Sequence, residues 1–305
     1  MDFNIVDEEN INIILFDNNE QKAKATCFYK NTPNYNGKDI GTIGEFEAEN
    51  IEYGKAIINK CLELLKNKGI EYAVGPMNGN TWKQYRTLKF SNGEPIFVLE
   101  NVGSIEQNEM FTESGFKEIY LYSSTKGKIK NAYESNILEE AKNRIKQDGI
   151  IIRNFNKNDY LADLKKIYNV SLKSFCKNPL YTPINEESFI KQYEKYIQMC
   201  DEELILLAEK DNETIGFLFS IPNFNELKEQ GKISTIILKT IAVLPEYEDY
   251  SIGNVLTNMI KQTAIDKGYE NWIFAFMYKN NTSQRMAKRN NTETIREYAL
   301  YGKEI

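Results

Sequence analysis

The stretch that decides the fold is residues 233–267: ISTIILKTIAV (233–243), LPEYEDYS (244–251) and IGNVLTNMIKQTAIDK (252–267). The first segment is rich in Ile and Thr and has Lys239 as its only charge, which predicts a long strand inside a sheet. Pro245 ends that strand, and the apolar period of the third segment predicts a helix that Gly268 stops. The turn at 244–251 therefore delivers the chain directly into a helix N-terminus.

This turn has the composition of an anion-binding site. Free N–H groups at the start of a helix attract anions, and the helix dipole adds to the effect. Ser251 is small and Gly253 has no side chain, so the backbone there can approach a phosphate closely. A second polar loop at 278–283 follows a predicted strand at 271–277 and also enters a helix. Together the two loops predict a cleft for a phosphate-bearing cofactor.

Each piece also has a plainer interpretation. A strand, a proline and a helix with one glycine form a common connector. The stretch 281–283 also suits an ordinary helix N-cap.

The rest of the chain divides into two halves in which the same short motifs occur in the same order. Lys-Gly, a short apolar strand, Met and Asn-Thr occur within 68–81 and again within 267–282, about 200 residues later. The segment 123–148 between the halves is rich in Lys, Asn, Ser and Glu, with few core residues. We therefore predict two domains, 1–124 and 149–305, joined by a linker at 125–148 that is largely helical.

The composition narrows the possible chemistry. The 305 residues include no histidine, which excludes Ser–His and Cys–His catalysis and histidine-ligated metals. The four cysteines form no CxxC pair, so we predict no metal site, and we expect Cys176 and Cys200 to be structural thiols. The net charge of −6 disfavours nucleic acid and anionic lipid as partners. With no apolar run long enough for a membrane span and no signal-like start, we expect a cytoplasmic protein.

Several motifs resemble those of the GNAT-type N-acyltransferases. Val243-Leu244-Pro245-Glu246-Tyr247, with Ile252-Gly253 and Leu256 beyond it, looks like the acyl-CoA-binding segment of that family. The predicted order of elements over 149–305 is similar as well. In the first half, Phe111-Thr112-Glu113-Ser114-Gly115-Phe116 resembles the family's last helix and strand, but its cofactor loop is missing. The resemblance implies an α/β (α+β) fold of two tandem GNAT-like domains, the first degenerate, each a mixed, largely antiparallel sheet flanked by helices.

The resemblance also implies a set of cofactor-binding residues for acetyl-CoA. The end of the long strand would pair with the pantetheine arm, the loop amides would hold the pyrophosphate, and an Asn after the next strand would contact the cofactor. These residues are Ile241, Ala242, Val243, Glu248, Asp249, Tyr250, Ser251, Ile252, Gly253, Asn254, Asn281 (or Asn280) and Ser283. The family pattern has Gln or Arg at position 248 and Gly at position 251. Glu248 and Asp249 would therefore place negative charge beside a diphosphate.

The catalytic assignments are less direct. Ala287 and Lys288 occupy the place of the tyrosine acid that is frequent in the family. We expect Tyr278, at the cleft end of its strand, or Tyr298, in the middle of the last strand, to substitute for it. Either tyrosine could instead serve only in packing. A carboxylate acting through water, or solvent alone, would serve as the base.

A segment of the first half adds to the resemblance. Residues 75–82, GPMNGNTW, with Arg86 just beyond, are similar to a segment of bacterial tandem-GNAT proteins. We expect this segment to line the substrate pocket, with a rigid Gly-Pro and Asn-Gly turn as the alternative.

Together these features predict an acetyl-CoA-dependent N-acyltransferase that acts on a small amine as a monomer or homodimer. Two alternatives stay open. The first is a non-catalytic protein that binds a ligand or a partner and has lost the cofactor. The second is a peptide- or aminoacyl-directed transferase, which would need an extended basic groove that the sequence does not show.

Overall fold

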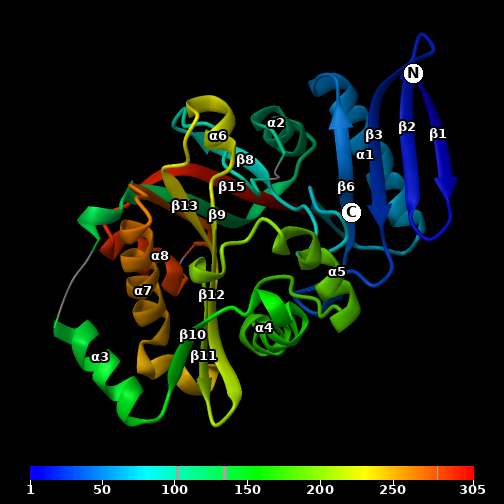
Figure 1. Ribbon diagram of the computed structural model, residues 1–305. Helices are drawn as coiled ribbons and strands as arrows, with labels where there is room; N and C mark the ends of the chain where they lie inside the picture. The colour runs from blue at the N-terminus through cyan, green and yellow to red at the C-terminus, as the bar shows by residue number, and fades with distance from the viewer. Residues whose placement is uncertain (101–102, 133–135, 280) are drawn as a thin grey trace.

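The computed structural model describes residues 1–100, 103–132, 136–279 and 281–305, and most of its strands belong to one sheet (Figure 1). In sheet order the strands are β1 (Asp2–Asp7), β2 (Ile11–Asp17), β3 (Glu20–Phe28), β6 (Gly41–Ala48), β7 (Tyr72–Gly75), β15 (Glu293–Glu304), β9 (Lys117–Lys128), β14 (Asn271–Tyr278), β13 (Thr235–Val243), β12 (Glu213–Pro222), β11 (Ile205–Lys210) and β10 (Ile151–Asn154). Strand β8 (Thr87–Ser91) pairs with β15, and β4 (Asn34–Tyr35) pairs with β5 (Lys38–Asp39) apart from the sheet. The sheet is mixed and largely antiparallel.

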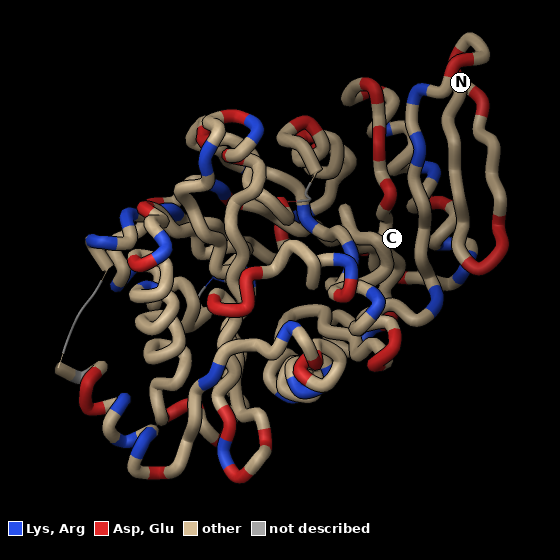
Figure 2. The backbone as a smooth tube through the Cα atoms, in the orientation of Figure 1, with Lys and Arg blue, Asp and Glu red and all other residues tan. Residues whose placement is uncertain are grey.

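Helices pack against this sheet and enclose the core. They are α1 (Ile51–Asn67), α2 (Ile105–Glu113), α3 (Asn136–Gln147), α4 (Tyr160–Phe175), α5 (Glu186–Ile197), α6 (Asn225–Gln230), α7 (Ile252–Asp266) and α8 (Thr282–Arg289). Helices α4 and α7 pack on β12 and β13, and α1 packs on β2, β3 and β6. No helix in the described part of the chain is both long and apolar enough to cross a membrane. Acidic and basic residues are interspersed along most elements in the view of Figure 2.

Each half contains the same strand–helix–strand unit. In the first half, α1 connects β6 to the parallel β7, and in the second half α7 connects β13 to the parallel β14. Both helices end at a glycine with a positive φ angle, Gly69 (79°) and Gly268 (82°), a backbone conformation that other residues adopt only with strain. These units account for the repeat in the sequence.

The halves are joined because their last strands lie side by side. Strand β9 pairs with β14 of the second half, and β15 lies between β9 and β7 of the first half. The predicted fold class is confirmed, and the pairing of β9 with β15 merges the two expected sheets into one. Strand β9 extends to Lys128, into the predicted linker 125–148, and α3 occupies much of the remaining linker. The domain boundaries themselves stay a prediction.

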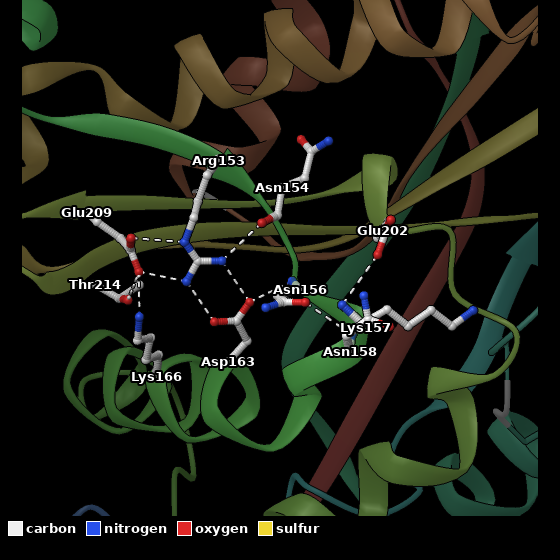
Figure 3. Close-up of polar contacts among 10 residues, drawn as sticks. All are labelled: Arg153, Asn154, Asn156, Lys157, Asn158, Asp163, Lys166, Glu202, Glu209 and Thr214. Carbon is white, nitrogen blue, oxygen red and sulfur yellow. Dashed lines mark hydrogen bonds and ion pairs between the residues drawn. The ribbon is translucent and has the colours of Figure 1, made fainter.

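A network of ion pairs fastens α4 to the sheet edge (Figure 3). The guanidinium of Arg153 on β10 donates two hydrogen bonds to Asp163, at 2.7 and 2.8 Å, and two to Glu209, at 2.8 and 2.9 Å. Lys166 adds a hydrogen bond of 2.8 Å to Glu209, and the N–H of Asn156 donates to Asp163 at 2.8 Å. Because Asp163 is only 3% exposed, we interpret the network as a structural clamp between α4, β10 and β11.

This clamp predicts an acid-sensitive contribution to stability. The hydrogen bond from Arg153, with that from Lys166, lowers the pKa of Glu209 from about 4.5 to about 2. Since the folded pKa lies below the unfolded one, the stabilisation is present above pH 4.5 and is lost as the pH falls toward 2. We expect wild type to lose about 1 kcal/mol more than Glu209→Gln over this range, measured by urea unfolding. Glu213→Gln, at an exposed site on β12, should behave as wild type, and equal losses in all three proteins would contradict the prediction.

Candidate active site

The two parallel strands at the centre of the second half part midway along their length. Strands β13 and β14 pair only from Thr235 with Asn271 to Leu238 with Phe274, although β13 continues to Val243. The pairing of β13 with β12 persists to Val243 on its other side. The β14-facing edge of residues 239–243 is therefore left without a neighbouring strand.

Both strands carry an irregularity where they part. On β13, Lys239 is an extra residue in the register, because Phe219 of β12 pairs with Thr240 and Ser220 pairs with Leu238. On β14, Phe276 has a φ angle of 55° and its N–H donates to Ser124 Oγ at 3.1 Å. Bulges of this kind bend a strand and redirect side chains. They provide the physical reason for the split in the sheet.

A cavity of about 230 Å³ occupies the split. The second half contributes Lys239, Ile241, Phe276 and Tyr278 to its wall, while the first half contributes Trp82 and Arg86. Trp82 is held by a hydrogen bond of 2.6 Å from its ring N–H to the carbonyl of Thr182. The GPMNGNTW segment thus reaches across to the second half, and its Trp lines the cavity, while the role of this segment in a substrate pocket stays a prediction.

The predicted cofactor residues on β13 and the following loop surround the start of α7. Ile241 lines the cavity, Ala242 is buried, and the Val243 carbonyl accepts a hydrogen bond of 3.0 Å from Ser174. Beyond them come a short 3₁₀ helix, Pro245–Tyr250, and Ser251 in the left-handed conformation with φ of 58°. The predicted residues within this stretch are Glu248, Asp249, Tyr250 and Ser251.

Helix α7 begins at the end of this loop. The N–H groups of Asn254 and Val255 donate to the Ser251 carbonyl, at 3.0 and 3.2 Å. The earlier amides of Ile252 and Gly253 lie at the first positions of the helix, where N–H groups have no intrahelical acceptor. The Glu248 and Asp249 side chains are exposed at the surface. The loop therefore still provides backbone donors for an anion.

The loop after β14 brings two further predicted residues to the cavity. Asn281 and Ser283 both line it, and Asn281 Oδ1 accepts a hydrogen bond of 3.0 Å from the Ser283 N–H as the N-cap of α8. Asn281 thus has the capping role that was the plainer interpretation, at a position that also faces the cavity. Asn280, the alternative cofactor contact, lies outside the described residues.

The two candidate tyrosines have different surroundings in the structure. Tyr278 is half-buried and lines the cavity, with its ring centroid 5.6 Å from that of Tyr122. Tyr298 is fully buried and does not line the cavity; its hydroxyl donates to Glu100 at 2.7 Å and lies 3.2 Å from Ser124 Oγ. Burial raises the pKa of Tyr298 above its ordinary value. Only Tyr278 is therefore placed to meet a bound molecule.

Two cationic side chains that sequence reasoning did not assign to the site also line the cavity. Burial, together with repulsion from the nearby Arg86, lowers the pKa of Lys239 to about 8. Its ammonium lies 4.8 Å from the ring centroid of Phe276. A signal for Lys239 was present, because it is the only charge in an otherwise apolar strand segment. Arg86 had been noted only as a residue beyond the GPMNGNTW segment.

Helix α3 lies against the loop before α7 and adds a third cation. The guanidinium of Arg144 donates a hydrogen bond to the Asp249 carbonyl and lies 4.9 Å from the ring centroid of Tyr250. Arg144 lies far from this loop in sequence, and nothing in the local pattern of its helix indicates the contact. It supplies a positive charge next to a loop whose own exposed side chains are acidic.

The split sheet and the helix that starts beside it define the fold class of the GNAT acyltransferases. Residues 168–291 match the family model described as the acetyltransferase (GNAT) family, so this part of the chain is similar to that family. Among solved structures with the same fold are the tandem GNAT protein from the clavulanic acid biosynthesis pathway and a GCN5-related N-acetyltransferase from Sphaerobacter thermophilus. The first has a TM-score of 0.55 at 7% identity over 97% of this chain and 82% of its own. The second has a TM-score of 0.55 at 11% identity over 97% and 80%.

Two curated relatives share parts of the sequence. A bacterial ceramide synthase from Caulobacter vibrioides is 22% identical over 168 residues, which cover 53% of this chain and 42% of that protein. An uncharacterized N-acetyltransferase from Archaeoglobus fulgidus is 28% identical over 116 residues, or 38% of this chain and 74% of that protein. The match thus spans less than half of the Caulobacter protein.

Proposed function

We propose that the chain is an acetyl-CoA-dependent N-acyltransferase that transfers an acyl group directly to a small amine. The observation that carries the proposal is the split between β13 and β14, because it leaves a strand edge, a cavity and a helix N-terminus next to one another. Acyl-CoA would supply a thioester-activated acyl group there. The site fits such a molecule, since the free edge of β13 can pair with an amide-bearing arm and the α7 amides can hold a diphosphate. Arg144 would offset the negative charge of Glu248 and Asp249.

The residues at the split support a direct transfer. Lys239 would accept the proton of the incoming amine, because its lowered pKa leaves much of it neutral near pH 8. A backbone N–H at the end of β13 would polarise the carbonyl that is attacked, and Tyr278 would donate a proton to the departing sulfur. A second cavity of about 490 Å³ is also lined by Arg86 and Lys239. Neither cavity has an Asp or Glu among the described residues that line it. A lysine base therefore suits this site better than a carboxylate acting through water, which was one of the two alternatives from the sequence.

The cofactor site can be tested by thermal unfolding with and without acetyl-CoA. A ligand at about 100 times its dissociation constant adds about 2.7 kcal/mol of stability, which raises Tm by a few degrees. We expect Gly253→Pro to abolish this shift, because proline fits the first turn of a helix but has no N–H to donate. Gly253→Ala is the matched control: its Cβ would lie 3.4 Å from Ile241 and 3.5 Å from Met286, which is ordinary contact, and it keeps the N–H.

Each variant's own unliganded Tm is the reference for its shift. The absence of a shift for wild type at millimolar acetyl-CoA would overturn the proposal. The non-catalytic binding protein would then be the better account of the chain.

A further inference from the structure

Arg86 is buried at the junction of the two halves. Its side chain is only 7% exposed, and its backbone is fixed in the left-handed region with φ of 72°. The Arg86 N–H donates to the Pro76 carbonyl at 2.8 Å, and the Arg86 carbonyl accepts from Gly103 at 3.4 Å. The surrounding structure therefore holds this guanidinium in place.

The guanidinium has no counterion in the described part of the chain. Its Nε and Nη1 atoms are buried and make no hydrogen bond. It lies instead over four aromatic rings, with centroids at 4.2 Å (Tyr85), 4.5 Å (Tyr122), 4.7 Å (Phe276) and 5.9 Å (Tyr298). Cation–π contacts offset part of the desolvation cost, but they leave the N–H groups without acceptors. An arginine cannot relieve the cost by releasing its proton.

A second buried arginine of the same chain shows the usual arrangement. The Arg296 Nε lies 3.1 Å from Glu100 Oε1, and both side chains are 3% exposed. The remaining donors of Arg296 reach backbone carbonyls, including that of Ile295 at 3.0 Å. Buried guanidinium groups are normally satisfied in this way. The unsatisfied donors of Arg86 therefore call for an acceptor that the protein itself does not provide.

The position of Arg86 indicates where a hydrogen-bond acceptor for its guanidinium would lie. Arg86 and Lys239 line the cavity between the strands, which we call the inner cavity, and they also line the second cavity of about 490 Å³, which we call the outer cavity. Gln84, Gln192 and Lys195 line this outer cavity. Because both residues line both cavities, a molecule in either one can reach Arg86 and Lys239 together. With no Asp or Glu among the described residues that line either cavity, both cavities favour an anionic group.

We propose that the acyl acceptor is an amine that carries a carboxylate, and that this carboxylate accepts hydrogen bonds from the guanidinium of Arg86. This inference rests on the proposed function and names its substrate class. A planar carboxylate matches the fork of a guanidinium and balances its single fixed charge. A phosphate dianion would need a second protonated cation beside Arg86, and Lys239, which lines both cavities with it, is assigned as the neutral base. The amine of the same molecule would then face Lys239.

The test compares acceptors that differ only in the carboxylate. The probes are glycine, β-alanine, 4-aminobutanoate and the common L-amino acids, each paired with its carboxamide, in the presence of acetyl-CoA. Acylation is followed by mass spectrometry, and binding is followed by calorimetry in the presence of CoA. We expect at least one acid to exceed its carboxamide about 100-fold in kcat/KM or affinity. Arg86→Met should remove this preference, and Arg86→Lys should restore only part of it, because lysine keeps the charge but not the fork.

The outcomes separate this inference from the proposed function. If each acid and its carboxamide had equal kcat/KM and affinity, or if the preference for the acid persisted in Arg86→Met, the inference would be overturned. Binding of acetyl-CoA would be unaffected by either result. Carboxylate binding that depends on Arg86 in a protein that does not bind acetyl-CoA would support the anion site and reject the acyltransferase. Inorganic phosphate that binds as tightly as the best acid would reject the carboxylate assignment. The unliganded Tm of Arg86→Met, expected to equal or exceed that of wild type, shows that the variant is folded.

Discussion

Replacement of Lys239 by Met should lower kcat/KM by about 10²- to 10⁴-fold, the usual contribution of a general base. Lys239 is the extra residue at the bulge of β13 and is held between the two cavities by its position in the sheet. Burial and the charge of Arg86 lower its pKa to about 8, so the neutral amine is abundant at moderately alkaline pH. Methionine has similar length and cannot take a proton. Lys191→Met, at an exposed site on α5, should leave kcat/KM unchanged.

The same assignment fixes the direction of the pH profile. The base acts when unprotonated, so kcat/KM of wild type should rise with pH and level off above about 8. The other titratable groups around the inner cavity are Arg86 and five tyrosines: Tyr85, Tyr122, Tyr181, Tyr193 and Tyr278. Burial raises the pKa of Tyr193 to about 12 and moves those of Tyr122 and Tyr181 upward as well. A rise near pH 8 that is absent from Lys239→Met would therefore report on Lys239, and a flat profile in wild type would contradict the assignment.

A readout that does not depend on activity comes from stability. Because the folded pKa of Lys239, about 8, lies below its ordinary value of 10.5, the unfolded chain binds more protons between these values. Wild type should therefore gain stability relative to Lys239→Met as the pH rises from 8 to 10. Urea unfolding of both proteins across this range measures the difference. A constant difference would mean that the pKa of Lys239 is not lowered in the folded protein.

The strand, turn and helix around residues 244–251 were predictable because their signals are local. The predicted strand at 233–243 and helix at 252–267 correspond to β13, which begins at Thr235, and α7, which ends at Asp266. The apolar period, Pro245 and Gly268 act within a few residues of the ends that they set. The pairing of β9 with β15 was not predicted, because it joins segments far apart in sequence. Strand composition indicates that a strand forms but does not identify its neighbour.

The same limit explains which parts of the site were missed. Tyr278, Ile241 and Asn281 could be placed near the cavity because each ends or follows a strand that the sequence shows. Arg86 enters the site only because its segment crosses from one half to the other. The alternation along β15 left open whether Tyr298 faced the cleft. Its hydroxyl instead meets Glu100, a contact that only the folded chain creates.

The buried pair of Arg296 and Glu100 should carry a large share of the stability. Glu100 accepts from Arg296 at 3.1 Å, from the Tyr298 hydroxyl at 2.7 Å and from the Phe97 N–H at 3.3 Å. Arg296 also donates to the carbonyls of Glu94 and Pro95, so the pair ties this loop to β15. Removal of one partner leaves the other as an unpaired buried charge. We expect Arg296→Met to reduce the free energy of unfolding by about 3–5 kcal/mol, measured by urea unfolding.

A comparison with Arg86 tests whether the loss of stability in Arg296→Met comes from the broken ion pair. Both arginines are buried, but only Arg296 has a carboxylate partner, so the two Met variants should change stability in opposite directions or by very different amounts. Removal of both partners in Arg296→Met/Glu100→Gln should cost less than the sum of the single changes, because no unpaired charge remains. Exposed Arg285→Met serves as the control for loss of an arginine at the surface. If Arg296→Met and Arg86→Met destabilised the protein equally, then pairing would not distinguish the two sites, and Arg86 would have to be regarded as a structural residue.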